Sequence, residues 1–508
     1  MIPDEPEQTA SQPTLLLIVR SLARSRPISG NCGDSIFVQS VMAWVVLVAG
    51  ALLMLAGLAG GSIFTQPLWT GSGALKMALF TAAYAGLALF AARFRPRLFL
   101  QALAILAAGY SMLAVGPLAV FGALWLLAGS FATGAWILKT RLKFIAKYPQ
   151  VVALLGLAVW SVFVAFTAHW PVHRAWVYWL VFLLPMFQAF RLRLVQGAFA
   201  SWSETSPDSV LPALAIFPAA VHWMVALKPE VSADGLAMHL VVAARMAARH
   251  FWPFDGSEFA RAVKPMNGDW IWSIAYILGG EGAAKLMNAL ILVLICWLLY
   301  TWLHEMVPAR LAGLLTAGFA SIPLVQRVTG SLDVENAAAA FLLTAMIFDR
   351  RYLKAQKLGD ALATAFLAGA AAATTLSALG IVVPLVLAAL VTFQGRHMFY
   401  GGLRGLAVGL HPYLTAAWRT GNPVFPYMNH YLRSPLFDMT APLVDPRFVS
   451  APNWRTWFDL SFRSSRFSEG GDGSFGVMFF VLAPLALVAV RRTWPRAGFA
   501  ALWMCVAG

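Results

Sequence analysis

Asp234 is the residue best placed to do chemistry in this chain. It stands in the first charged loop after an apolar run from about Val210 to Leu227, and His239 and Arg245 follow on one segment with helical character. A carboxylate can take a proton from an attacking hydroxyl group, and nearby cations can stabilise a phosphate leaving group. The pattern therefore predicts a proton-transfer site for a phosphate-bearing substrate at a membrane surface.

Further polar residues extend this candidate site along the same loop and into later loops. Aromatic faces suit sugar rings, whereas Arg and Lys side chains suit phosphate oxygens. An ordinary loop salt bridge explains any single one of these cations equally well, so the prediction depends on their combination. The candidate binding residues are His239, Arg245, Arg261, Lys264, Arg327, Asp333, Glu335, His411, Arg419 and Asn422.

The segment from Gly235 to Arg249 is predicted to be an amphipathic helix lying in the membrane interface. Gly and Pro are absent after its first residue, and cations on its polar side would meet lipid phosphate. A helix that only anchors the loop is the alternative. The apolar residues expected to face the membrane are Leu236, Leu240, Ala243, Ala244 and Ala247.

The composition identifies the elements that must position these residues. Hydrophobic residues make up 60% of the 508-residue chain and charged residues 12%, which excludes an ordinary soluble domain. Apolar runs of about twenty residues, long enough to cross about 30 Å of hydrocarbon as helices, recur along the chain. The sequence predicts an all-α polytopic membrane protein with about 14 to 15 transmembrane helices and an extracytoplasmic loop region.

The positions of basic residues predict the topology. The expected spans lie at about 40–61, 73–92, 98–115, 117–138, 150–168, 175–190, 210–227, 283–303, 308–326, 335–349, 360–376, 379–394, 398–414 and 475–490. Connections rich in Arg and Lys alternate with nearly neutral ones, and basic connections face the cytoplasm. The net charge of +15 thus reflects inside loops, and no nucleic-acid partner is expected. The N-terminus is predicted inside, and Asp234 outside.

The spans divide the chain into five predicted regions. They are a cytoplasmic tail (1–39), a six-helix membrane region (40–200), a catalytic membrane core (209–414) with an outer loop (228–282), an extracytoplasmic loop region (415–474) and C-terminal membrane segments (475–508). The last apolar run, Ala497 to Gly508, gives only about 18 Å of helix, which is too short to cross. This suggests that the chain is part of a longer one.

Three segments resemble the GT-C superfamily of polytopic glycosyltransferases, which includes protein O-mannosyltransferases and the lipid A aminoarabinose transferases. They are the loop with Asp234 and its surface helix, the stretch from Arg327 to Leu342, and the stretch from Gly421 to Tyr431. The resemblance covers about residues 209–490. It implies a GT-C-like fold, Asp234 as catalytic base, and Asp333 or Glu335 as a second acidic site residue.

The resemblance also implies the reaction and its partners. A sugar would move with inversion from a polyprenyl-phosphate donor to a lipid, glycan or protein acceptor outside a bacterial inner membrane. Asp234 is followed by Gly235, where many relatives have a second acid, so no metal site is predicted; a divalent cation stays an open alternative that no paired-acid motif supports. The six spans that precede the catalytic region also depart from typical members.

Two other functions stay open on the sequence. A transporter or lipid flippase would carry ionisable residues at mid-membrane depth, paired broken helices or a repeat. The span centres are almost free of charge, although a Gly-rich stretch around Gly401, Gly402 and Gly405 keeps this alternative. A noncatalytic membrane scaffold is the third possibility.

Overall fold

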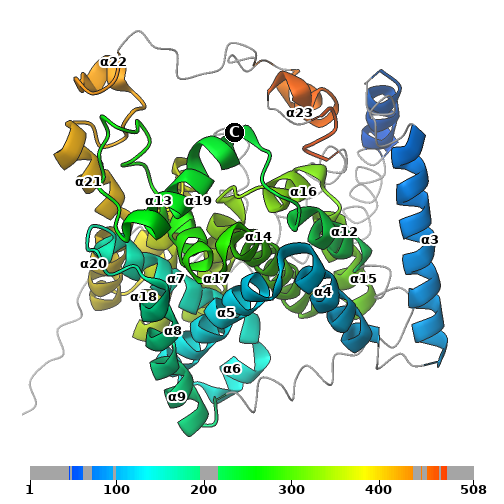
Figure 1. The fold of residues 1–508 in the computed structure, drawn as a ribbon, viewed down its shortest axis with the longest axis horizontal. Coiled ribbons are helices and arrows are strands. Elements are labelled where there is room, and N and C mark those ends of the chain that lie inside the picture. Colours follow the sequence, from blue (N-terminus) through cyan, green and yellow to red (C-terminus); the bar gives the residue numbers. More distant parts are fainter. Residues whose placement is uncertain are drawn as a thin grey trace, which may run out of the picture.

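The computed structural model describes residues 45, 48–60, 71–94, 99–194, 216–438, 448, 453, 455–467 and 471–476. Within this part of the chain every regular element is a helix and no strand occurs. The predicted cytoplasmic tail and almost all of the segment 475–508 lie outside the described residues. Figure 1 shows the helices gathered around α14, with α3 standing at one edge.

Most helices overlap the predicted spans, but the spans expected at 175–190, 308–326 and 398–414 are each divided between two helices, and α14 begins well before the span expected at 283–303. The helices are α3 (Gly71–Phe94), α4 (Phe99–Val115), α5 (Pro117–Ile137), α6 (Leu142–Lys147), α7 (Pro149–Thr167), α8 (Ala175–Val181), α9 (Leu183–Arg191), α12 (Phe217–Ala226), η4 (Gly235–His239), α13 (Leu240–Arg249), α14 (Asn267–His304), α15 (Ala309–Ala320), α16 (Pro323–Gly330), α17 (Glu335–Ala355), α18 (Leu358–Ala372), η5 (Leu376–Ala378), α19 (Leu379–Thr392), α20 (Gly395–Gly409), α21 (His411–Thr420), α22 (Asn429–Leu432), α23 (Thr456–Phe462) and η6 (Ser464–Arg466). Several begin at proline, which fits the first turn because that turn needs no backbone donor.

Four described helices are long and apolar enough to cross a membrane. They are the first part of α3, together with α5, α7 and α14, and the bent pair of α15 and α16 makes a fifth if it is one span. Other apolar helices have 10 to 17 residues. The structure therefore supports a helical protein with several membrane-spanning candidates, while the count of 14 to 15 spans stays a prediction.

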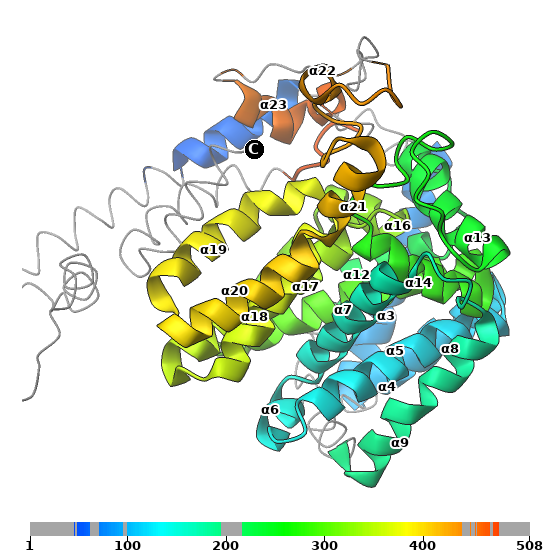
Figure 2. The same ribbon diagram turned by 90° about the vertical axis from the view of Figure 1, so that its left-hand side faces the viewer.

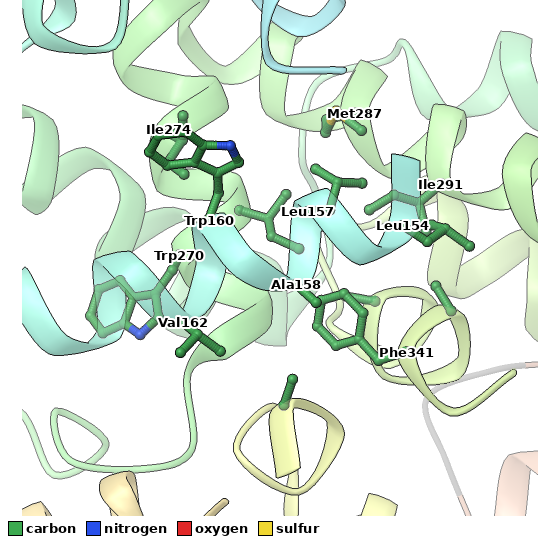
Figure 3. Packing of buried hydrophobic residues seen from close by; sticks show 14 of the residues in the cluster. Leu154, Leu157, Ala158, Trp160, Val162, Trp270, Ile274, Met287, Ile291 and Phe341 are labelled. Carbon is green, nitrogen blue, oxygen red and sulfur yellow. The ribbon is translucent and has the colours of Figure 1, made fainter. Parts of the chain in front are cut away.

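The core is built around α7, which comes from the predicted six-helix region, and it extends across the predicted catalytic core. Leu154, Leu157 and Trp160 on α7 pack in one cluster with Ile274 of α14 and Phe341 of α17. Figure 3 shows these side chains converging on α7 from the neighbouring helices. The helices that hold the candidate site are thus packed directly against helices from the N-terminal half of the chain.

Close helix approach at small residues tightens this core. A side chain added at Gly156 of α7 would meet the backbone of Ser130 on α5, and one added at Gly134 would meet the backbone of Val152. Glycine at both positions removes the atoms that would keep the two backbones apart. Small residues at crossings are typical of membrane helices, where packing rather than the hydrophobic effect drives association.

A charged cluster marks one end of the bundle. Arg141 and Arg351 both pair with the buried carboxylate of Asp360, and Glu305 pairs with Lys147 and Arg350. These residues belong to connections predicted to be cytoplasmic. Figure 2 places α6 at this lower end and α13, α16, α21 and α22 toward the other, so the two sets of loops lie at opposite ends of the helices.

A kink divides α14 near the predicted start of its span. Gly279 and Gly280 have non-helical backbone angles, and the φ of 73° at Gly280 is one that glycine adopts without strain. The part of α14 after the kink matches the span expected at 283–303. The part before it carries Asp269 and packs against α13, so it belongs to the outer loop that holds Asp234.

Candidate functional site

Asp234 lies at the start of a π-helical turn. It precedes η4, its own backbone is helical, and its side chain is 55% exposed with no capping hydrogen bond. A π-turn spaces its hydrogen bonds one residue wider than an α-helix does, and such turns occur frequently at functional sites. The wider turn changes the direction in which the side chains after Asp234 leave the helix, including that of His239.

His239 and Asp269 form a buried pair beneath this turn. The His239 Nδ1 atom lies 2.5 Å from Asp269 Oδ1, and both side chains are buried. Asp269 comes from the first turn of α14, so the pair ties the outer loop to the long helix. Asp269 Oδ2 has no hydrogen-bond partner in the described structure. A carboxylate hydrogen-bonded to Nδ1 fixes the orientation of the imidazole ring.

Two cations stand beside Asp234 and the buried pair. Arg261 lies 3.9 Å from Asp234, and both side chains are partly exposed. Arg261 and Lys264 both contact the sulfur of Met238. The charge of Lys264 also acts on Asp269. The structure thus brings Arg261 close to Asp234 and places Lys264 near the buried Asp269, while the binding roles of both cations stay predictions.

Asp333 and Glu335 approach the same site from the segment between α16 and α17. Burial raises the pKa of Asp333, while a hydrogen bond from Ser331 and the charges of His239 and Arg327 act to lower it. Asp234 is near enough to raise the pKa of Asp333 further. Glu335 is exposed on the first turn of α17, where a negative charge complements the helix dipole.

Glu230 is a buried acid of this region that the sequence analysis did not select. Its Oε1 atom accepts hydrogen bonds from the backbone of Val231 and Ser232 and from the Ser232 hydroxyl group. Its Oε2 atom accepts from the backbone of Leu332 at 2.7 Å and from Lys285 at 3.3 Å. Glu230 thereby joins the loop before Asp234 to the loop before Asp333.

The ionisation of Glu230 follows from these contacts. Burial opposes the charged form, but the hydrogen bonds from Ser232 and the charge of Lys285 outweigh it, so the pKa of Glu230 lies below its ordinary value. The sequence feature that could have identified Glu230 is Lys285, a cation at the start of a predicted span. A buried ammonium group needs a carboxylate partner, so an acid was to be expected near it.

Two buried amides complete this framework. Asn288 donates to the backbone oxygens of Val328 and Ser331, and Asn336 donates to Asn288 and to the Thr329 hydroxyl group. These bonds fix the turn between α16 and α17 on the side of α14. The position of Asp333 is therefore set by residues of three helices.

The helix expected to lie on the membrane has a different environment from the one predicted. Ala243 is buried and packs against α14 together with Val242 and Met246, so it does not face lipid. The apolar pattern alone could not predict this burial, because an apolar helix face can pack against another helix, here α14, as well as against lipid. His239 is buried as well, rather than lying on an exposed polar side.

Arg245 has a partner outside the Asp234 cluster. Its guanidinium group pairs with Glu258 at 3.0 Å and lies over the ring of Phe259, while Arg249 pairs with the same carboxylate. An ordinary loop salt bridge was the alternative weighed for each cation. For Arg245 the structure shows such a bridge, and its predicted binding role has no further support.

The three later candidates lie apart from the Asp234 cluster to different degrees. The His411 ring is tilted against that of Phe166, with 4.2 Å between their centres, and His411 lines a small pocket with Lys264, which connects it to the outer loop. Arg419 lies over its neighbour Trp418. The amide of Asn422 bonds to the backbone of Tyr427 and Val424, so its polar atoms hold the local turn.

The residues that the structure describes contain no group of three or more His, Cys, Asp or Glu side chains arranged to hold a metal ion. The site consists of the exposed carboxylate of Asp234, the buried pair of His239 and Asp269, and the cations Arg261 and Lys264. Such a set can accept a proton at one point and stabilise phosphate charge at another.

No protein-family model, no curated protein and no solved structure matches this chain. The class of protein therefore follows from the fold and the site themselves. It is a helical protein with several helices able to span a membrane and a charged polar cluster at one end of the bundle.

Proposed function

We propose that the protein is a membrane glycosyltransferase of GT-C type that moves a sugar from a polyprenyl-phosphate donor to an acceptor outside the membrane. The observation that carries this proposal is the gathering of Asp234, His239, Arg261, Lys264 and Asp333 from separate segments into one cluster. Carboxylates and cations in one place meet both chemical needs of the reaction.

The proposed reaction divides these needs between residues. The acceptor hydroxyl oxygen attacks the anomeric carbon, the bond from that carbon to the phosphate oxygen breaks, and the hydroxyl proton passes to Asp234. The phosphate leaves with the bonding electrons, and its charge is stabilised by Arg261 and Lys264. Since phosphate is already a good leaving group, no strong general acid is required.

The proposal includes the predicted number of spans and their orientation in the membrane. About 14 to 15 spans, an internal N-terminus and an external active site place the cluster on the side where lipid-linked sugars would be used. The separation of the basic cluster around Asp360 from the Asp234 cluster, at opposite ends of the helices, supports this arrangement. The acceptor can be lipid, glycan or protein.

The test compares envelope glycans in a strain that lacks the protein with those in strains that express variants. Asp234→Asn keeps size and polarity but cannot take a proton, so transfer should fall by about a hundredfold or more. Asp255→Asn is the matched control, because Asp255 is an exposed acid of the same loop whose side-chain hydrogen bonds, among the described residues, go to Ser257 and Glu258 of its own turn. Wild-type glycans from the Asp234 variant would contradict the proposal.

A transporter or flippase is the second candidate, and one observation favours it. The bent pair α15 and α16 turns by 62° at a short break, and α14 is kinked at Gly279 and Gly280. Broken helices are common around transporter binding sites. Purified protein in liposomes separates the two functions, since a transporter moves its substrate unchanged whereas a transferase forms a new glycosidic bond.

A further inference from the structure

Arg404 is a cation in the middle of a predicted span. It lies on α20, is exposed, and its guanidinium carbon is 5.6 Å from the centre of the Phe366 ring. Among the described residues no carboxylate pairs with it. An ionisable residue within a membrane helix is costly unless it finds a partner, so its position calls for one.

The surface around Arg404 is a shallow groove between α18 and α20. The two helices approach closely through small residues, and a side chain at Gly369 would lie 2.6 Å from the backbone oxygen of Gly405. Larger side chains flank this contact and form the walls. The groove has a volume of about 430 Å³ and is lined by Leu358, Leu362, Tyr400, Leu403, Arg404 and Ala407.

The groove lies near the basic end of the bundle, because its lining residue Leu358 begins α18. Arg404 is nine residues from the start of α20, or about 13 Å along its axis, and a helical side chain points back toward the helix start. Lys357 and Arg396, both exposed, stand at the starts of α18 and α20. The nearby carboxylate of Asp360 is buried and already paired with Arg141 and Arg351.

We propose that this groove binds an anionic phospholipid, with its phosphate on Arg404 and its acyl chains along Leu358, Leu362 and Leu403. The apolar walls fit hydrocarbon, and the unpaired cation fits a headgroup of net negative charge. Basic rims at the same end would attract the same lipid. This site is separate from the Asp234 cluster and does not depend on the glycosyltransferase proposal.

The test measures lipid affinity of the purified full chain in detergent by native mass spectrometry. Phosphatidylglycerol and phosphatidylcholine with identical acyl chains are compared. We expect wild type to prefer phosphatidylglycerol and Arg404→Gln to lose about fivefold of that affinity. Arg404→Lys should keep most of it. Arg310→Gln is the matched control, since Arg310 is an exposed arginine near the start of another apolar helix, α15.

A second variant tests the walls of the groove. Leu362→Trp fills the space while leaving Arg404 in place, so both lipids should bind more weakly. Equal affinity of wild type for the two lipids, or an Arg404→Gln protein that folds and binds like wild type, would overturn the proposal. Displacement of phosphatidylglycerol by an equal amount of decaprenyl phosphate would assign the groove to a lipid-linked carrier and overturn it as well.

Discussion

Removing one partner of the buried Glu230 and Lys285 pair should strongly destabilise the protein. The two side chains are 1% and 2% exposed, and the Lys285 Nζ atom lies 3.3 Å from Glu230 Oε2. Lys285→Met removes the ammonium group and leaves a carboxylate buried without its counterion. Breaking a buried pair in this way costs about 3 to 5 kcal/mol. With both groups shielded from water, no discount for solvent screening applies.

The assay is thermal or denaturant unfolding of the purified protein in detergent, with an exposed pair as control. Lys147 pairs with Glu305 at 2.8 Å, but the Lys147 side chain is 58% exposed. Lys147→Met should therefore lose less than about 1 kcal/mol. The double variant Glu230→Gln with Lys285→Met should recover only part of the loss. It leaves no buried charge, but the Gln amide nitrogen cannot accept the backbone N–H bond that a carboxylate oxygen takes from Leu332 or Ser232. A Lys285→Met protein no less stable than Lys147→Met would refute this reasoning.

The same pair has a pH signature. The pKa of Glu230 is lowered in the folded protein relative to its ordinary value of 4.5, so the unfolded chain binds the proton more readily. The stabilisation is present above 4.5 and is lost as the pH falls through the folded pKa. Wild-type stability should decline in that acid range more steeply than the stability of Glu230→Gln.

Three further predictions test other parts of the molecule. A reporter active only outside the cytoplasm should work when fused near Asp255 and fail near Lys143 or Lys354, and activity at Lys143 would invert the topology. Asp333→Asn should raise the melting temperature at pH 7, because burial raises the pKa of Asp333 and disfavours its charged form. The same variant should lower sugar transfer, and unchanged transfer would assign Asp333 a structural role only. Gly156→Val should prevent stable folding, since the added side chain would meet the backbone of α5, and a melting temperature equal to that of wild type would contradict the tight crossing.

The positions of the helices could be predicted from the sequence because local signals are strong in membrane helices. Apolar runs of about twenty residues fix where a helix lies, and Pro117 and Pro149 fix where two of them begin. The joining of the two halves of the chain was not predicted. It depends on which small residues meet across a crossing, such as Gly279 of α14, where an added side chain would meet the backbone of Leu118 and Ala119 on α5. Apolar periodicity carries no information about that choice.

The candidate site was predicted in part for a related reason. Asp234, Arg261 and Lys264 belong to one predicted outer loop, 228–282, so the sequence could place them on the same side of the membrane, but their contact depends on how α13 folds back between them. The pairing of His239 with Asp269 was missed because a π-turn, which no local pattern indicated, directs the imidazole ring inward. Arg245 was selected for its charge, but the structure pairs it with Glu258 at 3.0 Å.

Glu230 shows how a buried polar network could be found from sequence with one further step. Lys285 begins a predicted span, where a free ammonium group would be expensive, so a carboxylate from a neighbouring loop had to be near. Two acids, Glu230 and Glu281, precede Lys285 in the predicted outer loop. Glu230 binds Lys285, and Glu281 accepts a hydrogen bond from the backbone of Glu230. Glu230 also accepts a hydrogen bond from the backbone of Leu332, next to Asp333. Lys285, by holding Glu230, therefore helps to fix the loop that carries Asp333. The stability and the geometry of the candidate site therefore depend on the same ion pair.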